Sequence, residues 1–470
     1  MKRAIIILLA IVTQQSMAQI ADDALILSRW QHEGTARVTA MGGAYTALGG
    51  DLSSATINPA GLGLYRGSDF SFSVAGLLNK TTGSYFEADL ATHQYRMNMP
   101  TFGIALSSPN YNKLQSGDGP NSWTFGLGYN QIHTFNRAFG FEGTNNFNSY
   151  LDIGVPNPYD MYMDIFVDND VIFDPDGDGN YTHDYLEDNY GTYQEAFITE
   201  KGGIGEYYLS FAANFMDDLY LGATFGIQSV YISRTFEFSE TPTSPTNQLD
   251  YFDYYNSLKT SGLGLNLKLG LIYSPVYWFK FGAAIHTPTN YNLTDDYSEE
   301  IQSSVNGSVA YNSITPYIGD YDILTPTRIL GGVSFLIKKR ALISADYEFV
   351  DYSTAQLGAD DYSFTQENRD IADFYKPTHS FRLGGEYKIA MLALRAGGFY
   401  YASPFNNDLI NKDNYKLGYS LGLGFRSGSY YFDIAYSKTM ENLKYSPYGL
   451  TTASIDSDMT KIIGTLGFRF

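Results

Sequence analysis

The feature that most constrains this chain is an alternation of apolar residues with small or charged ones, repeated in segments of about ten residues. At the C-terminal end of the chain, the two faces of one such segment carry Ile462, Leu466 and Phe468 against Thr465 and Arg469. The same two-residue period recurs in residues 417–426 and 341–351. This is the period of a β-strand whose two faces meet different surroundings.

The length of these segments distinguishes a membrane barrel from a soluble sheet. Strands of soluble proteins usually run about 5–6 residues, and the alternating segments here are about twice as long. After residue 18 no apolar run approaches the roughly 20 residues that a transmembrane helix needs. A closed barrel is the other structure that satisfies every backbone hydrogen bond in lipid, and aromatic residues near the strand ends are typical of it. The pattern, with 41 Tyr and 31 Phe, predicts an all-β transmembrane barrel.

Fourteen antiparallel strands are predicted, an even number that suits a single-chain bacterial barrel. Short turns alternate with long connections, which we expect to face the periplasm and the outside, respectively. The longest connection, residues 136–203, contains fourteen acidic and two basic residues. The predicted strands are 70–78, 99–108, 122–134, 205–215, 219–238, 259–273, 277–287, 326–337, 341–351, 380–389, 392–402, 417–426, 430–440 and 461–470.

The N-terminus has the form of an export signal, and the composition narrows the function further. Lys2 and Arg3 precede an apolar stretch, and Ser16-Met17-Ala18 is a small-x-small cleavage site, so residues 1–18 are predicted to be a signal peptide.

The net charge of −20 argues against nucleic-acid binding. With no cysteine in the chain, disulfides, thiolate metal sites, a thiol nucleophile and a lipoprotein anchor are excluded.

The predicted barrel covers residues 70–470. The residues before it, 19–69, do not show the strand alternation. Asp22-Asp23 can cap a short helix that runs to Trp30, and glycine pairs then interrupt the chain repeatedly. We interpret this segment as a compact hatch that plugs the barrel lumen.

Two stretches of the hatch carry a resemblance to a known family. Residues 34–45 read GTARVTAMGGAY and residues 51–62 read DLSSATINPAGL. They resemble the N-terminal hatch of the FadL/TodX family of outer-membrane hydrophobic-compound transporters, whose most recognisable motif corresponds to Asn58-Pro59-Ala60. The resemblance implies a protein of the outer membrane of a Gram-negative bacterium, in contact with its lipids.

The same resemblance implies passive uptake of hydrophobic small molecules, such as long-chain fatty acids or aromatic hydrocarbons. A ligand would be captured outside and released sideways through a gap in the wall near the third strand. In this chain Gly126 and Gly128 are the candidates for that gap, because small inward residues could leave room for a ligand. The alternative function is that of a FadL-like protein-binding shuttle or adhesin.

Two sets of hatch residues each have a functional and a purely structural interpretation. Pro59 cannot donate a backbone hydrogen bond and biases Asn58 away from helix, so Asn58-Pro59-Ala60 is either a fixed turn or a ligand-responsive latch. Arg29, Arg37 and Arg66 could bind the head of an anionic amphiphile. Alternatively, they dock the hatch to acidic residues of the barrel.

The acidic connection contains a possible calcium loop. Asp174, Asp176 and Asp178 have the D-x-D-x-D-G spacing of a calcium-binding loop, and Asn180 follows. The twelfth position is Tyr185 rather than Glu, so Asp184 would have to supply the missing ligand. We expect no required cofactor, with Ca²⁺ as the candidate ion here and a merely solvated acidic loop as the alternative.

Nothing in the chain predicts an enzyme. Gly418-Tyr419-Ser420-Leu421-Gly422 matches G-x-S-x-G, but that motif works at a sharp strand-to-helix turn, and here it lies within an alternating strand. The six histidines lack metal-binding spacing.

The final residue, Phe470, ends an alternating strand. By resemblance to outer-membrane proteins, we expect it to be recognised by the barrel-assembly machinery. The structural alternative is one more aromatic residue of the girdle at the membrane surface.

Overall fold

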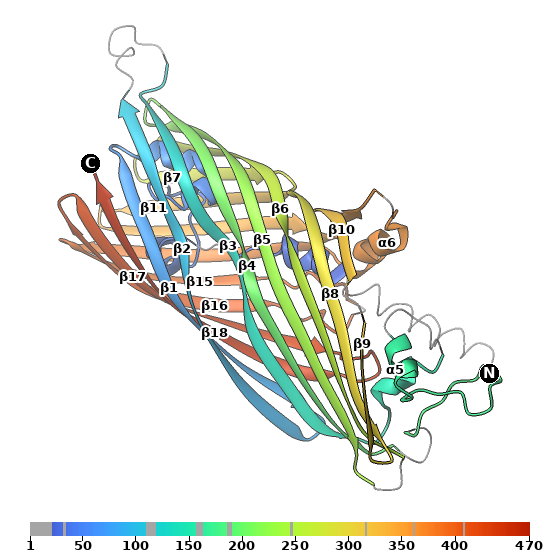
Figure 1. The fold of residues 1–470 in the computed structure, drawn as a ribbon. Coiled ribbons are helices and arrows are strands. Elements are labelled where there is room, and N and C mark those ends of the chain that lie inside the picture. The colour runs from blue at the N-terminus through green and yellow to red at the C-terminus, as the bar shows by residue number, and fades with distance from the viewer. Residues whose placement is uncertain are drawn as a thin grey trace.

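The computed structural model describes residues 21–31, 34–109, 119–156, 163–185, 190–244, 248–314, 317–360, 362–407 and 409–470. Its dominant feature is one antiparallel sheet that closes on itself (Figure 1). Among the described residues, no helix is long and apolar enough to cross a membrane.

The sheet contains eighteen strand segments, which tilt together around the axis of the molecule (Figure 1). They are β1 (Asp69–Tyr85), β2 (Ala88–Pro109), β3 (Ser122–Asn145), β4 (Thr192–Phe215), β5 (Leu219–Pro242), β6 (Leu249–Val276), β7 (Phe279–His286), β8 (Asn290–Val305), β9 (Ser308–Ser313), β10 (Tyr317–Leu324), β11 (Arg328–Ile337), β12 (Ala341–Asp351), β13 (Gln356–Gly358), β14 (Pro377–Ile389), β15 (Leu392–Tyr401), β16 (Lys416–Ser427), β17 (Tyr430–Tyr445) and β18 (Ala453–Arg469).

These segments form a ring of fourteen strands. Three of the fourteen strands are each built from two segments. The first consists of β7 and β8, which both pair with β6. The second consists of β11 and β10, which pair with β7 and β8, and the third consists of β12 and β13, which pair with β11 and β10. Segment β9 is the return arm of a hairpin with β8. The ring closes where β1 pairs with β18. The predicted fourteen-stranded antiparallel barrel is confirmed.

The alternation separates lipid-facing from lumen-facing side chains as the sequence predicts. On β16, the outward residues Leu417, Leu421 and Phe425 are exposed, whereas Ser420 is buried on the inward side. The predicted short turns, such as the one between β16 and β17, lie at the end of the barrel that also holds the C-terminus (Figure 1).

Several strands extend far beyond the predicted bounds, which is a correction to the sequence analysis. Strands β3, β4 and β5 have 24 residues each, and β6 has 28, although about 9–11 suffice to cross a membrane. On β5 the outward side chains change from apolar to polar, from Phe225 and Ile227 to Thr235, Glu237 and Ser239. The wall therefore continues past the apolar band and projects from the membrane.

The extended wall also changes the predicted connections. Residues 79–98 form the ends of β1 and β2 and a hairpin turn at Phe86-Glu87, where Phe86 has φ of +48°. Residues 288–325 contain β8, β9 and β10, and the connection before β14 contains η4 (Tyr352–Thr354), β13 and α6 (Thr365–Phe374). Neither stretch is the simple loop that the sequence predicts.

The acidic connection between β3 and β4 packs into the open end of the extended wall. We call its described residues 146–156 and 163–185 the outer plug. The outer plug contains η2 (Tyr150–Ile153) and α5 (Asp164–Asp168), and it lies at the end of the barrel opposite the C-terminus (Figure 1). Its buried apolar side chains contact inward residues of the wall such as Phe238 and Phe252. These apolar side chains of the connection are therefore removed from water.

Candidate functional site

The hatch fills the part of the lumen nearest the C-terminal end of the barrel. It contains α2 (Ala36–Ala40), α3 (Ser54–Ile57) and η1 (Pro59–Leu64). Thr35 caps α2 by accepting a hydrogen bond from the backbone nitrogen of Val38, and Gly42 and Gly43 then turn the chain with positive φ. Helix α2 packs against β15 to β18, and η1 packs against β3 to β6. The hatch thus spans the lumen from one side to the other.

Asn58-Pro59-Ala60 lies where the hatch touches β5 and β6. The Asn58 side-chain amide donates to the carbonyl oxygens of Thr46 (2.7 Å) and Leu271 (3.0 Å), and its oxygen accepts from the backbone nitrogen of Ala60 (3.2 Å). Pro59 is the first residue of η1, where its missing N–H costs nothing. One side chain therefore fixes the turn and ties it to the wall.

Inward-facing glycines of the wall leave room for the hatch backbone. A Cβ at Gly270 would lie 2.0 Å from the Asn58 side-chain oxygen, and one at Gly222 would lie 2.3 Å from the Pro59 carbonyl carbon. Gly282, Gly384 and Gly397 approach other parts of the hatch backbone just as closely. We call these five residues the glycine seat: Gly222, Gly270, Gly282, Gly384 and Gly397.

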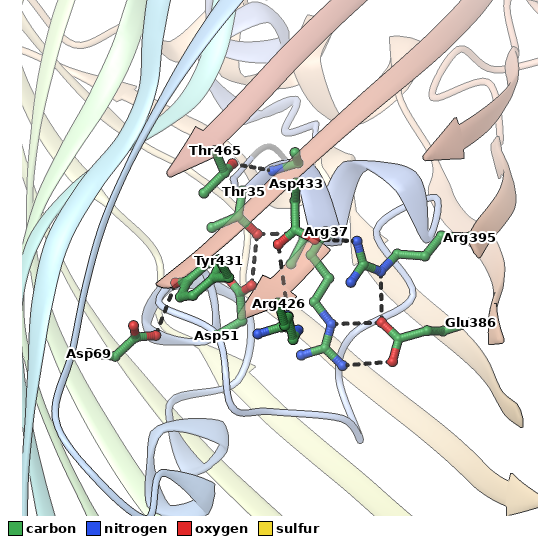
Figure 2. Close-up of polar contacts among 12 residues, drawn as sticks. Thr35, Arg37, Asp51, Asp69, Glu386, Arg395, Arg426, Tyr431, Asp433 and Thr465 are labelled. Carbon is green, nitrogen blue, oxygen red and sulfur yellow. Dashed lines mark hydrogen bonds and ion pairs between the residues drawn. The ribbon is translucent and has the colours of Figure 1, made fainter. Parts of the chain in front are cut away.

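Buried charges hold the hatch to the opposite wall (Figure 2). Arg37 donates to Glu386 through two nitrogens, at 3.1 and 3.3 Å, and Arg395 bridges Glu386 (2.7 Å) to Asp433 (2.6 Å). Arg426 lies 3.8 Å from Asp433. The lumen charges therefore pair with one another across the strands of this side of the wall.

Two further wall side chains bind the hatch backbone. Asp346 accepts hydrogen bonds from the backbone nitrogens of Tyr45 and Thr46, both at 2.8 Å. Ser420 donates to the carbonyl oxygen of Ala40 and accepts from the backbone nitrogen of Gly42, both at 3.1 Å. The serine of the G-x-S-x-G match thus lies within β16 and serves to hold the hatch.

The three candidate arginines all meet carboxylates of the barrel. Arg37 pairs with Glu386 as described above, Arg29 lies 3.5 Å from Glu441, and Arg66 lies 2.8 Å from Asp217. These contacts favour the docking interpretation over a free cation that waits for a ligand.

The segment before the hatch motif is buried deeper in the lumen. Residues 21–28 are helical, so Asp22 and Asp23 lie inside the described helix and do not precede it. The centroid of the Trp30 ring lies near two cations, 4.8 Å from the Arg328 guanidinium and 5.3 Å from the Lys268 ammonium. This helix of the hatch and the inward side chains around it form a continuous apolar cluster between the rest of the hatch and the outer plug. The sequence shows that the helix of residues 21–28 has an apolar face, but it does not indicate which residues of the wall pack against that face.

The wall has an interrupted ladder between β2 and β3. Pairing of these strands, both described in full, runs from Pro109–Ser122 to Thr101–Asn130 and ends there. Beyond this point β2 pairs only with β1, and β3 pairs only with β4 after a bulge next to Gln131. We call residues 88–100 and 131–145 the seam.

Side chains, and not backbone pairs, connect the two sides of the seam. Arg96 of β2 donates to the carbonyl oxygens of Phe135 (3.2 Å) and Gly202 (2.9 Å). Thr92 donates to the carbonyl oxygen of Ala138 (2.9 Å), and Asn98 donates to Gln131. Arg96 lies in an alternating polar stretch, and nothing in the sequence sets it apart.

The two glycines proposed for the lateral gap lie below the seam. Gly126 pairs with Ala105 and Gly128 pairs with Gly103, so both are in the continuous ladder. The space above Gly126 is occupied by Leu62 of the hatch, and that above Gly128 by the Tyr208 hydroxyl group.

The aspartates of the predicted calcium loop lie together at the exposed surface of the outer plug. Asp174, Asp176 and Asp178 are the one group of three potential metal ligands found in the described part of the chain, with oxygens within 4.8 Å of one another. Backbone hydrogen bonds, first from Gly179, lower the pKa of Asp174. Asn180 bonds to Asp178 (2.7 Å), and Asp184 accepts a hydrogen bond from the backbone nitrogen of Leu249 (2.8 Å).

A closed fourteen-stranded barrel with an apolar outer band and a lumen filled by its own N-terminal segment defines the class of outer-membrane transport barrels. A family model described as outer membrane protein transport protein (OMPP1/FadL/TodX) matches residues 206–446. The chain belongs to this family of outer-membrane transport proteins. The protein is therefore located in the outer membrane of a Gram-negative bacterium.

Solved structures share the fold. A Pseudomonas aeruginosa FadL homologue is similar with a TM-score of 0.56 and 14% identity, over 93% of this chain and 98% of that chain. The P. putida toluene transporter TodX is similar with a TM-score of 0.54 and 14% identity, over 94% and 99%. No curated protein sequence matches the chain significantly.

Proposed function

We propose that the protein takes up hydrophobic small molecules passively, by rearrangement of the hatch and lateral release through the seam. Long-chain fatty acids and aromatic hydrocarbons are the ligand classes that the family membership supports. The exported barrel carries no feature that predicts energy coupling, so a ligand would move down its own concentration gradient.

The hatch rearrangement is the first step that the proposal requires. The hatch is buried against the wall on both sides, so a ligand passes only if part of the hatch moves. Movement of Asn58 would break three hydrogen bonds at once, because its side chain bonds to Thr46, Leu271 and Ala60. In this proposal Asn58-Pro59-Ala60 acts as a latch that a ligand displaces.

The interrupted ladder between β2 and β3 is the single observation that carries lateral release. Opening a continuous barrel ladder in lipid exposes backbone groups that have no partner there, at several kcal/mol for each group. At the seam these backbone pairs are already absent, and Arg96, Thr92 and Asn98 make the connections instead. Side chains can release and re-form such contacts without breaking a sheet. We propose the seam for the exit, in place of the paired positions Gly126 and Gly128.

A reversible cross-link across the seam tests this proposal. Asn98→Cys and Gln131→Cys place two thiols on side chains that touch across the seam, and the chain has no other cysteine. A short bifunctional reagent that reductant can cleave then ties the strands together. We expect uptake of a radiolabelled fatty acid or of toluene by whole cells to fall at least tenfold and to recover after reduction.

The control places the same cross-link where the ladder is continuous. Leu394 and Leu423 are exposed and directly paired on β15 and β16, so Leu394→Cys with Leu423→Cys should leave uptake unchanged when linked. Normal uptake by the seam-linked protein would exclude lateral release there, whereas loss of uptake in both linked proteins would indicate general damage.

The shuttle alternative and the assembly signal are tested separately. A stoichiometric secreted protein that co-purifies with the barrel would favour the shuttle, and a bound apolar small molecule would favour uptake.

For Phe470, whose ring stacks on Phe468 at 5.7 Å, we propose recognition by the barrel-assembly machinery. Deletion of Phe470 should leave unfolded chain in the periplasm, whereas a residue of the girdle alone would give normal amounts of a less heat-resistant barrel.

A further inference from the structure

A pocket of about 400 Å³ lies between the hatch and the wall at the C-terminal end of the barrel. Hatch residues 48–50 and 64–67 form one side, and the ends of β7, β11 and β14 form the other. Ser68 and Phe470 exchange two backbone hydrogen bonds, of 2.9 and 3.0 Å, at this same end. The pocket therefore opens toward the periplasm, away from the outer plug.

The charge of this pocket is opposite to that of the protein. Seven of its nineteen lining residues are Lys or Arg, whereas one, Glu386, is acidic. The whole chain has 30 basic and 50 acidic residues. The Glu386 carboxylate is already shared among Arg37, Arg395 and Lys388, and Arg66 and Arg469 pair with Asp217 and Asp69. Among the described residues that line the pocket, the cations left for another anion are Lys280, Lys339 and Arg340.

Lys280 is the cation that most clearly lacks a partner. It lies half-buried at the start of β7, and no described residue forms an ion pair or hydrogen bond with its ammonium group. The charges of Arg37 and Arg66 act on it, and both are positive. A half-buried ammonium group among like charges is costly unless an anion accompanies it.

The remaining walls of the pocket are apolar and reach the membrane surface. Leu48, Leu64 and Leu336 line it, as does Trp278, which is exposed together with Tyr277 on the outer face of the barrel. Exposed Trp and Tyr side chains are typical of the level of the lipid headgroups. The pocket thus joins a cationic interior to the edge of the periplasmic leaflet.

We propose that this pocket binds a phosphate group, carried by a phospholipid headgroup or free in the periplasm. Lys280 and Arg340 border the space from the wall and the periplasmic turn, and Arg66, which pairs with Asp217, borders it from the hatch. Arginine can hold two phosphate oxygens at once, and lysine supplies a compact charge. The site is independent of the uptake route, which leaves through the opposite half of the wall.

Binding is measured on the purified full-length barrel in detergent. Native mass spectrometry with added phosphatidylglycerol tests the lipid, diacylglycerol tests the same chains without phosphate, and calorimetry tests inorganic phosphate. Lys280→Gln removes the unpaired charge, and Lys259→Gln makes the same change at an exposed position on the projecting wall. We expect phosphate-dependent binding that Lys280→Gln weakens at least about tenfold, as expected for a charge-assisted hydrogen bond, and that Lys259→Gln leaves unchanged.

The arms of the experiment distinguish the source of the phosphate. Binding of phosphatidylglycerol alone identifies the lipid headgroup, and binding of inorganic phosphate identifies a free anion. The proposal is overturned if neither binds, if diacylglycerol binds as well as phosphatidylglycerol, or if Lys280→Gln binds like the unchanged protein. Heat-modifiable migration establishes that each variant is folded, and the exposed Arg340→Gln replaces Lys280→Gln if that variant does not fold.

Discussion

The two inserts that fill the lumen, the hatch and the outer plug, are held by different proportions of directional and apolar contacts. The hatch meets the wall through backbone approach at the glycine seat and through directional bonds such as Arg37–Glu386 and Asp346–Thr46. The outer plug packs against it mainly through rings, with Tyr150 5.0 Å from Phe238 and Phe166 5.7 Å from Phe252 between ring centroids. It adds fewer directional bonds, such as Asp184–Leu249.

This difference bears on what each insert can do. Directional contacts are satisfied in one position and lost together when the hatch moves, so the hatch has discrete seated and displaced states. Apolar ring contacts depend mainly on area removed from water and tolerate small shifts. We therefore expect the hatch to act as the gate and the outer plug to act as a cover that strengthens the projecting wall.

The largest effect is expected from a side chain placed in the glycine seat. Gly270→Val puts atoms where the Asn58 side chain lies, within 2.0 Å for the Cβ alone, and overpacking of this kind costs about 3 kcal/mol or more. The hatch should be displaced, and the open lumen should raise ion conductance in planar bilayers several-fold. Gly331→Val is the control, because a Cβ there meets nothing within 4 Å. Equal conductance of the two variants would show that the hatch does not depend on the seat.

A core substitution in the outer plug should act locally. Phe166 is fully buried, and Phe166→Ala should destabilise the plug by about 3–5 kcal/mol. We expect rapid proteolysis within residues 163–185 while conductance stays low, because the hatch remains seated. Phe147→Ala, at an exposed ring, should change neither. A rise in conductance after Phe166→Ala would remove the distinction between gate and cover.

The helix of residues 21–28, which is the part of the hatch nearest the outer plug, should respond to pH. Burial raises the pKa of Asp23 to about 7, despite the attraction of Arg234, and the neighbouring carboxylates of Asp295 and Asp22 act in the same direction as burial. A raised folded-state pKa means that the stability contributed by Asp23 is complete below about 4 and is lost as pH rises through about 7. The protection factors of the amides in this helix, which correct for the base catalysis of exchange itself, should therefore be lower at pH 8 than at pH 5. Asp23→Asn should reduce that difference, and an unchanged difference would assign it to another group.

The smallest effect concerns calcium at the surface of the outer plug. If Asp174, Asp176 and Asp178 bind Ca²⁺, the ion should protect residues 163–185 from protease, and Asp178→Asn should abolish the protection. We expect little change in the hatch or in conductance. Equal cleavage with calcium and with chelator would leave the cluster an ordinary exposed acidic turn.

Much of the barrel could be predicted from the sequence, because strand alternation is a local property. Residues 417–426 show which side chains face lipid without any knowledge of their neighbours, and the short turns mark where one strand reverses into the next. The projecting wall was missed because its outward face turns polar, so the apolar alternation fades at residues such as Thr235 and Glu237. The outer plug did carry a local signal, the apolar run at Ile165-Phe166-Val167, within an otherwise acidic connection.

By itself the sequence determined the number of membrane strands, their inward and outward faces, and a glycine-interrupted hatch that resembles one family. The tertiary structure alone decided which groups meet. Arg37 and Glu386 are 349 residues apart, and the seam depends on where pairing between β2 and β3 stops. Strand register and ring closure fix such contacts, and both arise from pairing between distant segments that no local period encodes.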